Sequence, residues 1–587
     1  MAIIPQIFFR WITSAWARTY TRRSEKTLLP SWQATHVEQG RRQLFPKTAS
    51  RWGQPHGRGQ LALFVVAGML TASGCTSWGD YWRNNMKVGP TYQRPIAPVE
   101  PEWIDADDPQ VRSECGVESQ WWRQFNDPML DQLVLHAYEQ NLSLREAGFR
   151  VLASRAAYNI TVGGFMPQAQ GAIAEYARWQ LSNNVSAFQN LSIPPFSLWQ
   201  TGFNLSWELD LWGKIRRKIE SAAAEYQARV EEYDGVLVTL IADVADRYVD
   251  YRVACHQVAD LQRLLKIQRD SLQVAIDRFE GGITSELDVS QARLNLTKTE
   301  ALVPYYEREA RLATNALCML LGIPPEDLAL RLGEADIPTV PASLVIGIPA
   351  ELIRRRPDVR QAERLVAAQC AQIGVAEAQL YPSFSINGYL GVYANEIGQL
   401  FESDSLYGFV APVVDWKILN YGRLLNNIRQ QDAKFLALSA EYQQTVLRAG
   451  REAEDGIVTT IKARIAADKQ REAVTAASRS AELVEIQYKE GASDFNRVFV
   501  VQQTQVTEQI RLNTSVGGVA KGMIKIYRAL GGGWQLRLDA LAASGQCCKP
   551  LPRVEGTHCD DYIGKQPPAG FDAWCLWTEW LRGKKPR

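Results

Sequence analysis

The sequence predicts a mainly α-helical protein with a small β part, in which one structural unit occurs twice in tandem. Three pairs of glycines share one separation of 209 residues (422 − 213, 491 − 282 and 531 − 322). These pairs are Gly213 and Gly422, Gly282 and Gly491, and Gly322 and Gly531. Each copy also contains two alternating runs followed by a long, proline-free run of helical periodicity. We therefore expect each copy to comprise a helix, a pair of strands, a long helix, a tight turn and a returning helix.

Composition narrows the class of protein. The chain has 587 residues, of which 46% are hydrophobic, and a formal net charge of +1. This charge balance argues against a nucleic-acid binder, which needs a basic excess. No stretch contains the roughly 18 to 20 apolar residues of a membrane-spanning helix, and the longest apolar run is Leu61–Leu70.

The apolar run Leu61–Leu70 is best interpreted as the core of a signal peptide. Arg51 and Arg58 precede it, and the small residues Ala72-Ser-Gly lead into Cys75. This pattern is typical of a bacterial lipoprotein cleavage site, so residues 1–74 are expected to form a presequence. Cys75 would then carry an N-acyl diacylglycerol. The alternative is an ordinary cleaved signal followed by an incidental cysteine.

Of the eight other cysteines, Cys115 lies alone in the tether and seven fall into two groups. Three lie on predicted helices, where small apolar packing is the simplest role: Cys255, Cys318 and Cys370. Four crowd the carboxyl terminus, where two disulfides with three possible connectivities are expected in an exported protein: Cys547, Cys548, Cys559 and Cys575. A zinc site that includes His558 is the alternative for this second group.

The first copy begins after an extended, proline-rich tether over residues 75–119, in which Pro90 and Pro95 oppose helix formation. Asn126 or Asp127 could cap the first helix, which has Pro128 near its start. A second helix is expected over residues 143–161.

A strand pair is expected over residues 168–210. On its second strand, alternate residues are apolar and polar: Trp199, Phe203, Leu205, Trp207 and Leu209 share one face. This pattern fits a sandwich strand or a barrel strand with lipid outside and water inside. Two hairpins are too few for a sandwich, and four strands cannot close a barrel alone. Three chains would supply about twelve strands, an even number within the range of such barrels.

The long helix of the first copy should run from Lys214 to about Glu280, which is roughly 100 Å at about 1.5 Å per residue. Gly281-Gly282 ends it, and Thr284 or Ser285 could cap the returning helix.

The second copy repeats this plan. Asp358 is the expected cap of its first helix, and strands are expected over residues 384–393 and 407–416. The second long helix should span Arg423–Lys489 and end at a turn containing Gly491, and its returning helix should end at Ala529.

Several motifs, in this order and spacing, resemble outer-membrane channels of the TolC family, in the lipoprotein subclass of efflux systems. They are Val88-Gly-Pro90 with Tyr92, Trp121-Trp122 with Asp127-Pro128, Trp207-Glu-Leu-Asp-Leu-Trp-Gly213, Arg355-Arg-Pro-Asp-Val-Arg360, Ile373-Gly-Val-Ala376, Tyr381-Pro-Ser383 and Ala529-Leu-Gly-Gly-Gly-Trp534. The resemblance implies a trimer with a twelve-stranded transmembrane β-barrel, four strands per chain, continuous with a periplasmic α-helical barrel.

The resemblance also assigns roles to particular residues. The strand-to-helix junctions would be at Trp207, Gly213, Trp416 and Gly422. The turns at the periplasmic tip, which would contact an adaptor, contain Gly282, Thr284, Gly491 and Ser493. Asp288, Asp494 and Arg497 would constrict the entrance; the simpler interpretation of Asp288 and Asp494 is a solvated helix start. Val500 stands where family members often have an acidic residue.

The organisation that follows is a presequence (1–74), a tether (75–119), a first repeat (120–350), a second repeat (351–534) with its hairpin at about 383–417, and an extension (535–587). The implied partners are two further copies, a periplasmic adaptor, an inner-membrane pump of the resistance-nodulation-division (RND) type and outer-membrane lipid. The implied location is the outer membrane, with a lipid anchor. Nucleic acid is not an expected partner.

Three other kinds of protein are alternatives to an efflux channel. An enzyme is disfavoured because the sequence has no HExxH motif, nucleophile elbow or phosphate loop, so no catalytic residue, metal ligand or cofactor is expected. A periplasmic coiled-coil scaffold would not explain the amphipathic strands or Cys75. A channel of the same fold for type I protein secretion is the closer alternative, although the lipoprotein features favour efflux of drugs or metal ions.

The lipoprotein prediction is tested by Cys75→Ser. The variant should lose all incorporation of radiolabelled or alkyne-tagged fatty acid, because the hydroxyl cannot replace the thiol as acyl acceptor. Cys255→Ser, which leaves Cys75 intact, is the control and should label normally. Undiminished labelling of the Cys75 variant would refute the prediction.

Overall fold

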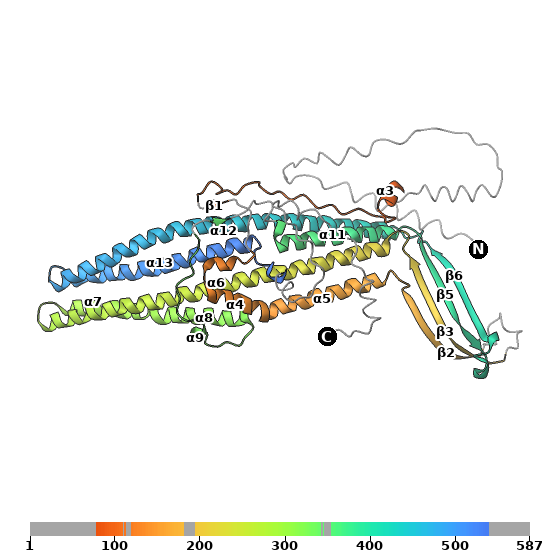
Figure 1. Cartoon of the computed structure of the whole chain (residues 1–587), viewed down its shortest axis with the longest axis horizontal. Coiled ribbons are helices and arrows are strands. Elements are labelled where there is room, and N and C mark those ends of the chain that lie inside the picture. Colours follow the sequence, from red (N-terminus) through yellow and green to blue (C-terminus); the bar gives the residue numbers. More distant parts are fainter. Residues whose placement is uncertain are drawn as a thin grey trace, which may run out of the picture. The chain divides into compact units, whose positions relative to one another are not determined.

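The computed structural model describes residues 78–109, 111–112, 119–180, 194–341, 344–345 and 354–538. Within these ranges, no helix is both long and apolar enough to cross a membrane. The predicted presequence, Cys75 and the four carboxyl-terminal cysteines lie outside the described residues. The described part is mainly helical with a small antiparallel sheet, as the sequence predicts (Figure 1).

The helices of the first half are α3 (Trp78–Arg83), α4 (Pro128–Gln140), α5 (Leu142–Gly163), α6 (Lys214–Glu280), α7 (Glu286–Glu300), α8 (Leu302–Leu321) and α9 (Ala329–Leu332). Those of the second half are α11 (Pro357–Ala378), α12 (Arg423–Lys489) and α13 (Phe495–Ala529). Short 3₁₀ turns occur at Trp121–Phe125, Ile397–Gln399 and Ser403–Ser405. A two-residue parallel pair joins β1 (Val111–Arg112) and β4 (Leu344–Val345).

Two long helices dominate the fold. The α6 and α12 helices contain 67 residues each, and both end where the sequence analysis expected. Each is followed by a returning helical segment, α7 and α8 after α6, and α13 after α12, which lies alongside it (Figure 1). Helix α11 packs against both α6 and α12 and so joins the two halves.

The six glycines that are paired at 209 residues share one backbone conformation. All have φ between 69° and 79°, in the left-handed region that other residues avoid. Gly213 and Gly422 precede the first residues of α6 and α12. Gly282 and Gly491 lie in the turns that follow these helices. The paired sequence positions therefore have paired geometric roles.

The hydrophobic core lies where the amino-terminal and carboxyl-terminal parts of the described chain meet. Trp121 and Trp122 are fully buried, and Trp121 stacks on Tyr527 of α13 with ring centroids 5.1 Å apart. Asp127 caps α4 by accepting from the backbone N–H groups of Met129 and Leu130, which confirms one of the two predicted caps. Truncating either tryptophan would cost about 3–5 kcal/mol.

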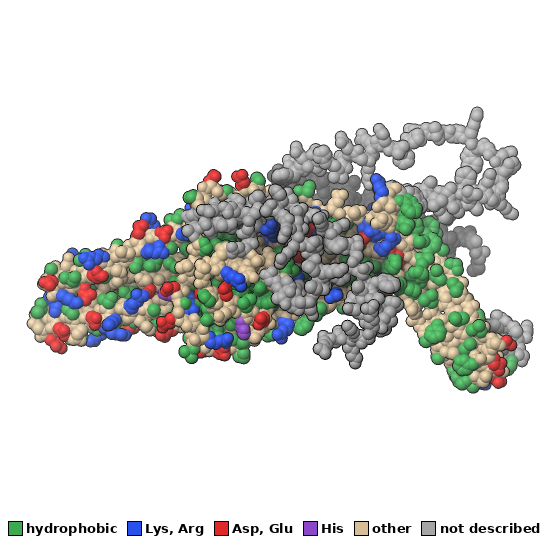
Figure 2. Space-filling view, viewed as in Figure 1, with side chains coloured by type: hydrophobic (Ala, Val, Ile, Leu, Met, Phe, Trp, Pro, Cys, Tyr) green, Lys and Arg blue, Asp and Glu red, His purple; other side chains and the backbone are tan. Residues whose placement is uncertain are grey.

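The antiparallel sheet has the order β2-β3-β5-β6. Its strands are β2 (Ala169–Trp179), β3 (Phe196–Leu209), β5 (Ser383–Ala394) and β6 (Leu406–Asp415). The centre of the sheet pairs β3 with β5, with Trp207 opposite Ile386. Among the residues that the structure describes, β2 and β6 each have one neighbouring strand, so both outer edges of the sheet have no strand partner there. Hydrophobic side chains cover much of the visible face of the sheet, whereas charged side chains are spread over the helices (Figure 2).

Two local expectations were wrong. Asp358 does not cap α11; the helix begins at Pro357, its N-cap is Arg356, and Asp358 lies in the first turn. Proline at the first helical position presets the helical φ, so the helix starts two residues upstream of the start that an Asp358 cap would give (359 − 357). The returning helix of the first half is also not continuous, because Pro304 lacks the N–H that would bond Glu300, and α7 ends at that residue.

Candidate functional site

The predicted site residues lie in two separate regions. Trp207, Gly213, Trp416 and Gly422 lie where the strands meet the long helices. The other predicted residues lie in or beside the two turns at the far ends of α6 and α12 (Figure 1). We call these regions the junction and the tip.

The first junction is organised by Asp210. Its carboxylate accepts from the backbone N–H groups of Ile215 (2.8 Å) and Arg216 (3.0 Å). Gly213, the residue before α6, has no side chain with which to do this, so Asp210 satisfies the exposed amides of the first helical turn in its place. The Arg216 guanidinium also donates to Asp210 at 2.9 Å.

Aromatic residues connect this junction to the second half of the chain. Trp212 stacks on Tyr381 with ring centroids 4.7 Å apart, and its Nε1 donates to the carbonyl of Pro382 at 2.7 Å. Trp207 Nε1 donates to the carbonyl of Phe165, just before β2, at 3.3 Å. The ends of β3 and β5 are thus held together where the strands meet the helices.

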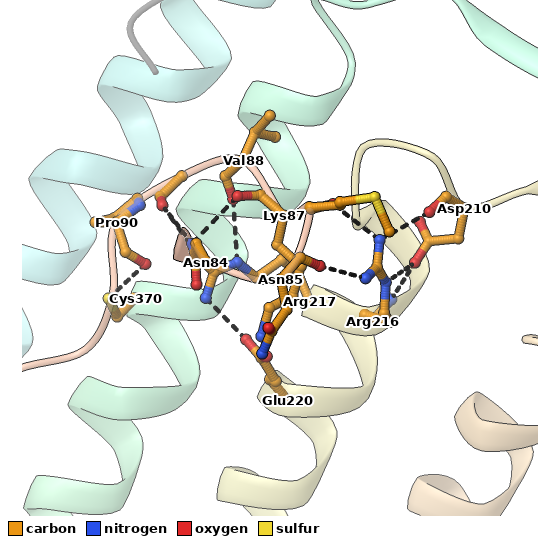
Figure 3. Close-up of polar contacts among 12 residues, drawn as sticks. Asn84, Asn85, Lys87, Val88, Pro90, Asp210, Arg216, Arg217, Glu220 and Cys370 are labelled. Carbon is orange, nitrogen blue, oxygen red and sulfur yellow. Dashed lines mark hydrogen bonds and ion pairs between the residues drawn. The ribbon is translucent and has the colours of Figure 1, made fainter. Parts of the chain in front are cut away.

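Residues 84–94, which we call the N-terminal segment, bind to this junction (Figure 3). We call the contacts that hold this segment the clasp. Arg216 donates to the carbonyl of Asn85 at 2.6 Å and to that of Met86 at 2.9 Å. Arg217 donates to the carbonyls of Val88 (3.1 Å) and Gly89 (3.0 Å). Two adjacent arginines at the start of α6 therefore bind the backbone of the N-terminal segment over a short stretch.

Close glycine packing explains two of the sequence motifs. A Cβ on Gly89 would lie 2.4 Å from the Cα of Gly374 on α11. A Cβ on Gly374 would lie 2.9 Å from Arg217 Nε and 3.0 Å from the carbonyl oxygen of Val88. The Val88-Gly-Pro and Ile373-Gly-Val motifs are therefore two sides of one contact.

Ion pairs complete the clasp. Lys87 and Arg217 pair with Glu220, and Arg94 and Arg364 pair with Glu363. Burial opposes ionisation of both carboxyls, but these hydrogen bonds and charges outweigh burial and hold the pKa of each glutamate below its usual value. The stabilisation is therefore present above the ordinary carboxyl pKa of about 4.3. It is lost as the pH falls through the depressed pKa values.

The second junction is simpler. Trp416 Nε1 donates to the carbonyl of Leu380 at 3.0 Å, and the Asn420 side chain accepts from the N–H of Gly422 at 3.1 Å. Trp416 and Trp207 thus make equivalent contacts, each with a backbone carbonyl just before a strand.

The tip holds its two turns together through Arg278, at the end of α6. Its guanidinium donates to the carbonyl of Tyr488 and lies 4.8 Å from the centroid of the Tyr488 ring. The Tyr488 hydroxyl in turn donates to Asp288 at 3.4 Å, and Asp288 also accepts from Thr284. The last turn of α12 is therefore tied to the first turn of α7.

The other predicted tip residues are placed differently. Asp494 caps α13 by accepting from the backbone N–H of Arg497 at 3.1 Å, so it is separate from the Asp288 contacts. Ser285, rather than Thr284, is the N-cap residue of α7, and its side chain makes no capping bond. Gly282 has open space around it, and the Ser493 hydroxyl contacts the carbonyl of Asp494.

Sequence reasoning missed Arg278, Tyr488 and the arginine pair Arg216 and Arg217. A signal for Arg278 exists, because the equivalent position 209 residues later holds Gln487. A cation therefore distinguishes the first turn from the second. Across the described ranges, no group of three or more His, Cys, Asp or Glu could hold a metal ion.

Comparisons with known proteins agree on one family. A family model described as outer membrane efflux protein matches residues 133–323 and 348–532. Nodulation protein T of Rhizobium leguminosarum is 30% identical over 76% of this chain and 90% of its own length. A toluene efflux pump outer membrane protein of Pseudomonas putida, TtgF, is 30% identical over 76% of this chain and 93% of its own. The solved structure of the outer-membrane channel OprN matches with a TM-score of 0.72 and 33% identity, over 76% of this chain and 99% of that one.

The close packing at Gly374 predicts different effects for alanine at two helical glycines. Gly374→Ala should weaken docking of the N-terminal segment by about 1–3 kcal/mol, because its Cβ overlaps the segment and Arg217. Faster proteolysis within residues 84–94 would report this loss. Gly518→Ala on α13 is the matched control, since nothing lies within 4 Å of its Cβ. If the Gly374→Ala variant resists the protease as well as the wild type does, the close contact between Gly374 and the N-terminal segment is contradicted.

The tip contacts predict that Arg278→Ala loosens the second turn. The variant removes both the hydrogen bond to Tyr488 and the ring contact, each worth about 1 kcal/mol. Amide hydrogen exchange over residues 488–494 should rise about tenfold or more as a result. Arg269→Ala removes an exposed arginine that pairs with Glu300 on α7 and should leave this exchange unchanged. If both variants behave alike, Arg278 does not hold the turns together.

Proposed function

Because this chain belongs to the outer membrane efflux protein family, whose members are channels, we propose that it is the exit duct of a tripartite efflux system. In this role it passes small molecules from a pump and adaptor through the periplasm and outer membrane. The observation that carries the proposal is the junction itself, where a two-faced sheet continues directly into helices of 67 residues. Several relatives, among them TtgF of Pseudomonas putida, are named as outer membrane proteins of efflux pumps, which supports efflux over protein secretion.

The proposed functional unit is a homotrimer. Strands β2 and β6 leave unpaired edges, and lipid offers no hydrogen bonds to unpaired backbone groups. Three copies would pair β6 of each with β2 of the next, giving a closed sheet of twelve strands. The two repeats would correspondingly contribute α6 and α12, with their returning helices, to an α-helical barrel.

Exposed apolar residues on α12 support packing of a second copy along the helices. Four exposed residues recur every 11 positions: Leu425, Leu436, Leu447 and Val458. Eleven residues correspond to three turns at about 3.67 residues per turn, so these side chains form one row along the helix. A row of this length on one helix face is explained by contact with a neighbouring protomer.

A lipid anchor at Cys75 fits the position of the N-terminal segment. Two residues lie between Cys75 and the start of α3, so the three residue steps from Cys75 to Trp78 (78 − 75) can span at most about 11 Å. The Tyr81 hydroxyl of α3 donates to the carbonyl of Leu211 in the junction at 2.8 Å. Acyl chains on Cys75 would therefore enter the membrane beside the strand ends, and the clasp would transmit the anchoring to α6.

The tip is proposed as the adaptor contact, with an RND-type pump behind the adaptor in the inner membrane. Gly282 and Thr284 in one turn, and Gly491 and Ser493 in the other, would offer the contact surface. Asp288, Asp494 and Arg497 would narrow the entrance beside it.

Planar-bilayer recording tests both the channel and its entrance. The purified protein should produce stepwise single-channel currents, and Asp288→Ala combined with Asp494→Ala should raise the conductance by removing two side chains per protomer. Asp288→Asn with Asp494→Asn is the matched variant, because Asn preserves size and helix capping while removing the charge. Absence of any current would refute the channel; unchanged conductance in the alanine variant would refute the entrance assignment alone.

A further inference from the structure

The two faces of the four-stranded sheet differ in chemistry, as the pairing register shows. Residues paired across antiparallel strands point to the same side. Asn204, opposite Tyr389, and Ser206, opposite Asn387, belong to one face, which we call the polar face. The other, the aliphatic face, includes Phe203 opposite Leu390 and Val392 opposite Leu406. In the proposed barrel, the polar face lines the lumen.

Four aromatic rings interrupt the polar face on β5 and β6, and we call them the tyrosine cluster. Its members are Tyr389, Tyr393, Tyr407 and Phe409. Ring centroids are 5.1 Å apart for Tyr393 and Tyr407, 6.0 Å for Tyr389 and Tyr407, and 6.1 Å for Tyr407 and Phe409. Tyr407 and Phe409 are about half exposed, so the cluster presents ring surface to the lumen side.

A pair of glycines leaves space beside the cluster. Gly202 and Gly391 face each other across β3 and β5. The Tyr389 hydroxyl lies where their side chains would be, 2.7 Å and 2.6 Å from the Cβ positions of Gly202 and Gly391. The side chain of Tyr389 therefore extends over the backbone of the two glycines, which lack the side chains that would exclude it.

All charged strand residues on the polar face are acidic. Within the four described strands this face carries Glu175, Glu208 and Asp415 and no lysine or arginine. Glu208 is paired with Lys214. Glu175 lies in the same cross-strand row as Tyr393, through Gln200. Two strand spacings of about 4.8 Å place its backbone roughly 10 Å from that of Tyr393.

We propose that the tyrosine cluster and Glu175 form a binding surface in the channel lumen for small organic cations that carry an aromatic ring. Ring faces attract cations and stack on other rings, and the carboxylate adds charge complementarity across about one ligand width. Three copies would place three such surfaces around the outer half of the lumen. This inference rests on the proposed function, because only the closed sheet makes the polar face a lumen.

The test is block of potassium current through single channels by benzyltrimethylammonium. Wild-type channels should be blocked, and Tyr393→Leu with Tyr407→Leu should need about tenfold more of the cation, since two contacts between the cation and an aromatic ring are lost. Tyr393→Phe with Tyr407→Phe retains the rings and should retain the block. Phe384→Leu, on the aliphatic face of β5, should not change it.

Two further measurements make the test independent of how the double variant folds. Glu175→Gln leaves the cluster intact and should weaken the block, and benzenesulfonate, an aromatic anion, should block much less than the cation. Conducting channels that are blocked equally by cation and anion, or equally with and without the two rings, overturn this inference. Wild-type protein that produces no current at all overturns the proposed function instead.

Discussion

The two unpaired edges of the β2-β3-β5-β6 sheet are the constraint on which the rest of the structure depends. Each backbone N–H or C=O left unpaired in hydrocarbon costs several kcal/mol, so the proposed membrane location requires further chains to pair these edges. The exposed apolar row on α12 leads to the same conclusion for the helical part. Under the proposed function, each chain is one segment of a barrel wall that several chains complete.

At each junction the chain passes from a strand to a long helix, and the backbone polar groups there must still be hydrogen-bonded. A strand cannot continue into a helix without a change of backbone direction, and glycines with positive φ supply that change at both junctions. At the first junction, Asp210 bonds the exposed amides of α6, and the arginines that follow bind the N-terminal segment. Capping by Asp210 and binding of the N-terminal segment by Arg216 and Arg217 therefore involve residues within one short stretch, which explains why the Trp-Glu-Leu-Asp-Leu-Trp-Gly motif is followed by basic residues.

Much of the fold could be predicted from the sequence because its signals are local. The bounds of α12 follow from a glycine before Arg423 and uninterrupted helical periodicity up to Lys489, and the strands follow from alternation. The start of α11 and the interruption at Pro304 were missed, because proline geometry competed with capping preference and with periodicity. The two tip turns could also be predicted from the sequence, because a turn that contains glycine occurs in both copies at the same separation.

The contacts within the site could not be predicted in the same way. Gly89 and Gly374 are 285 residues apart (374 − 89), and only the folded chain shows that they touch. Arg278 and Tyr488 meet across two different hairpins. The tyrosine cluster required the pairing register, because alternation within β5 alone does not show which face of β3 it joins.

The most direct measurement of the central claim is a density map of the full-length protein purified from membranes. The account predicts three copies around one continuous bore, with β6 of each copy hydrogen-bonded to β2 of the next. A particle in which these two strands stay unpaired, or in which no bore passes through both the sheet and the helices, would contradict it.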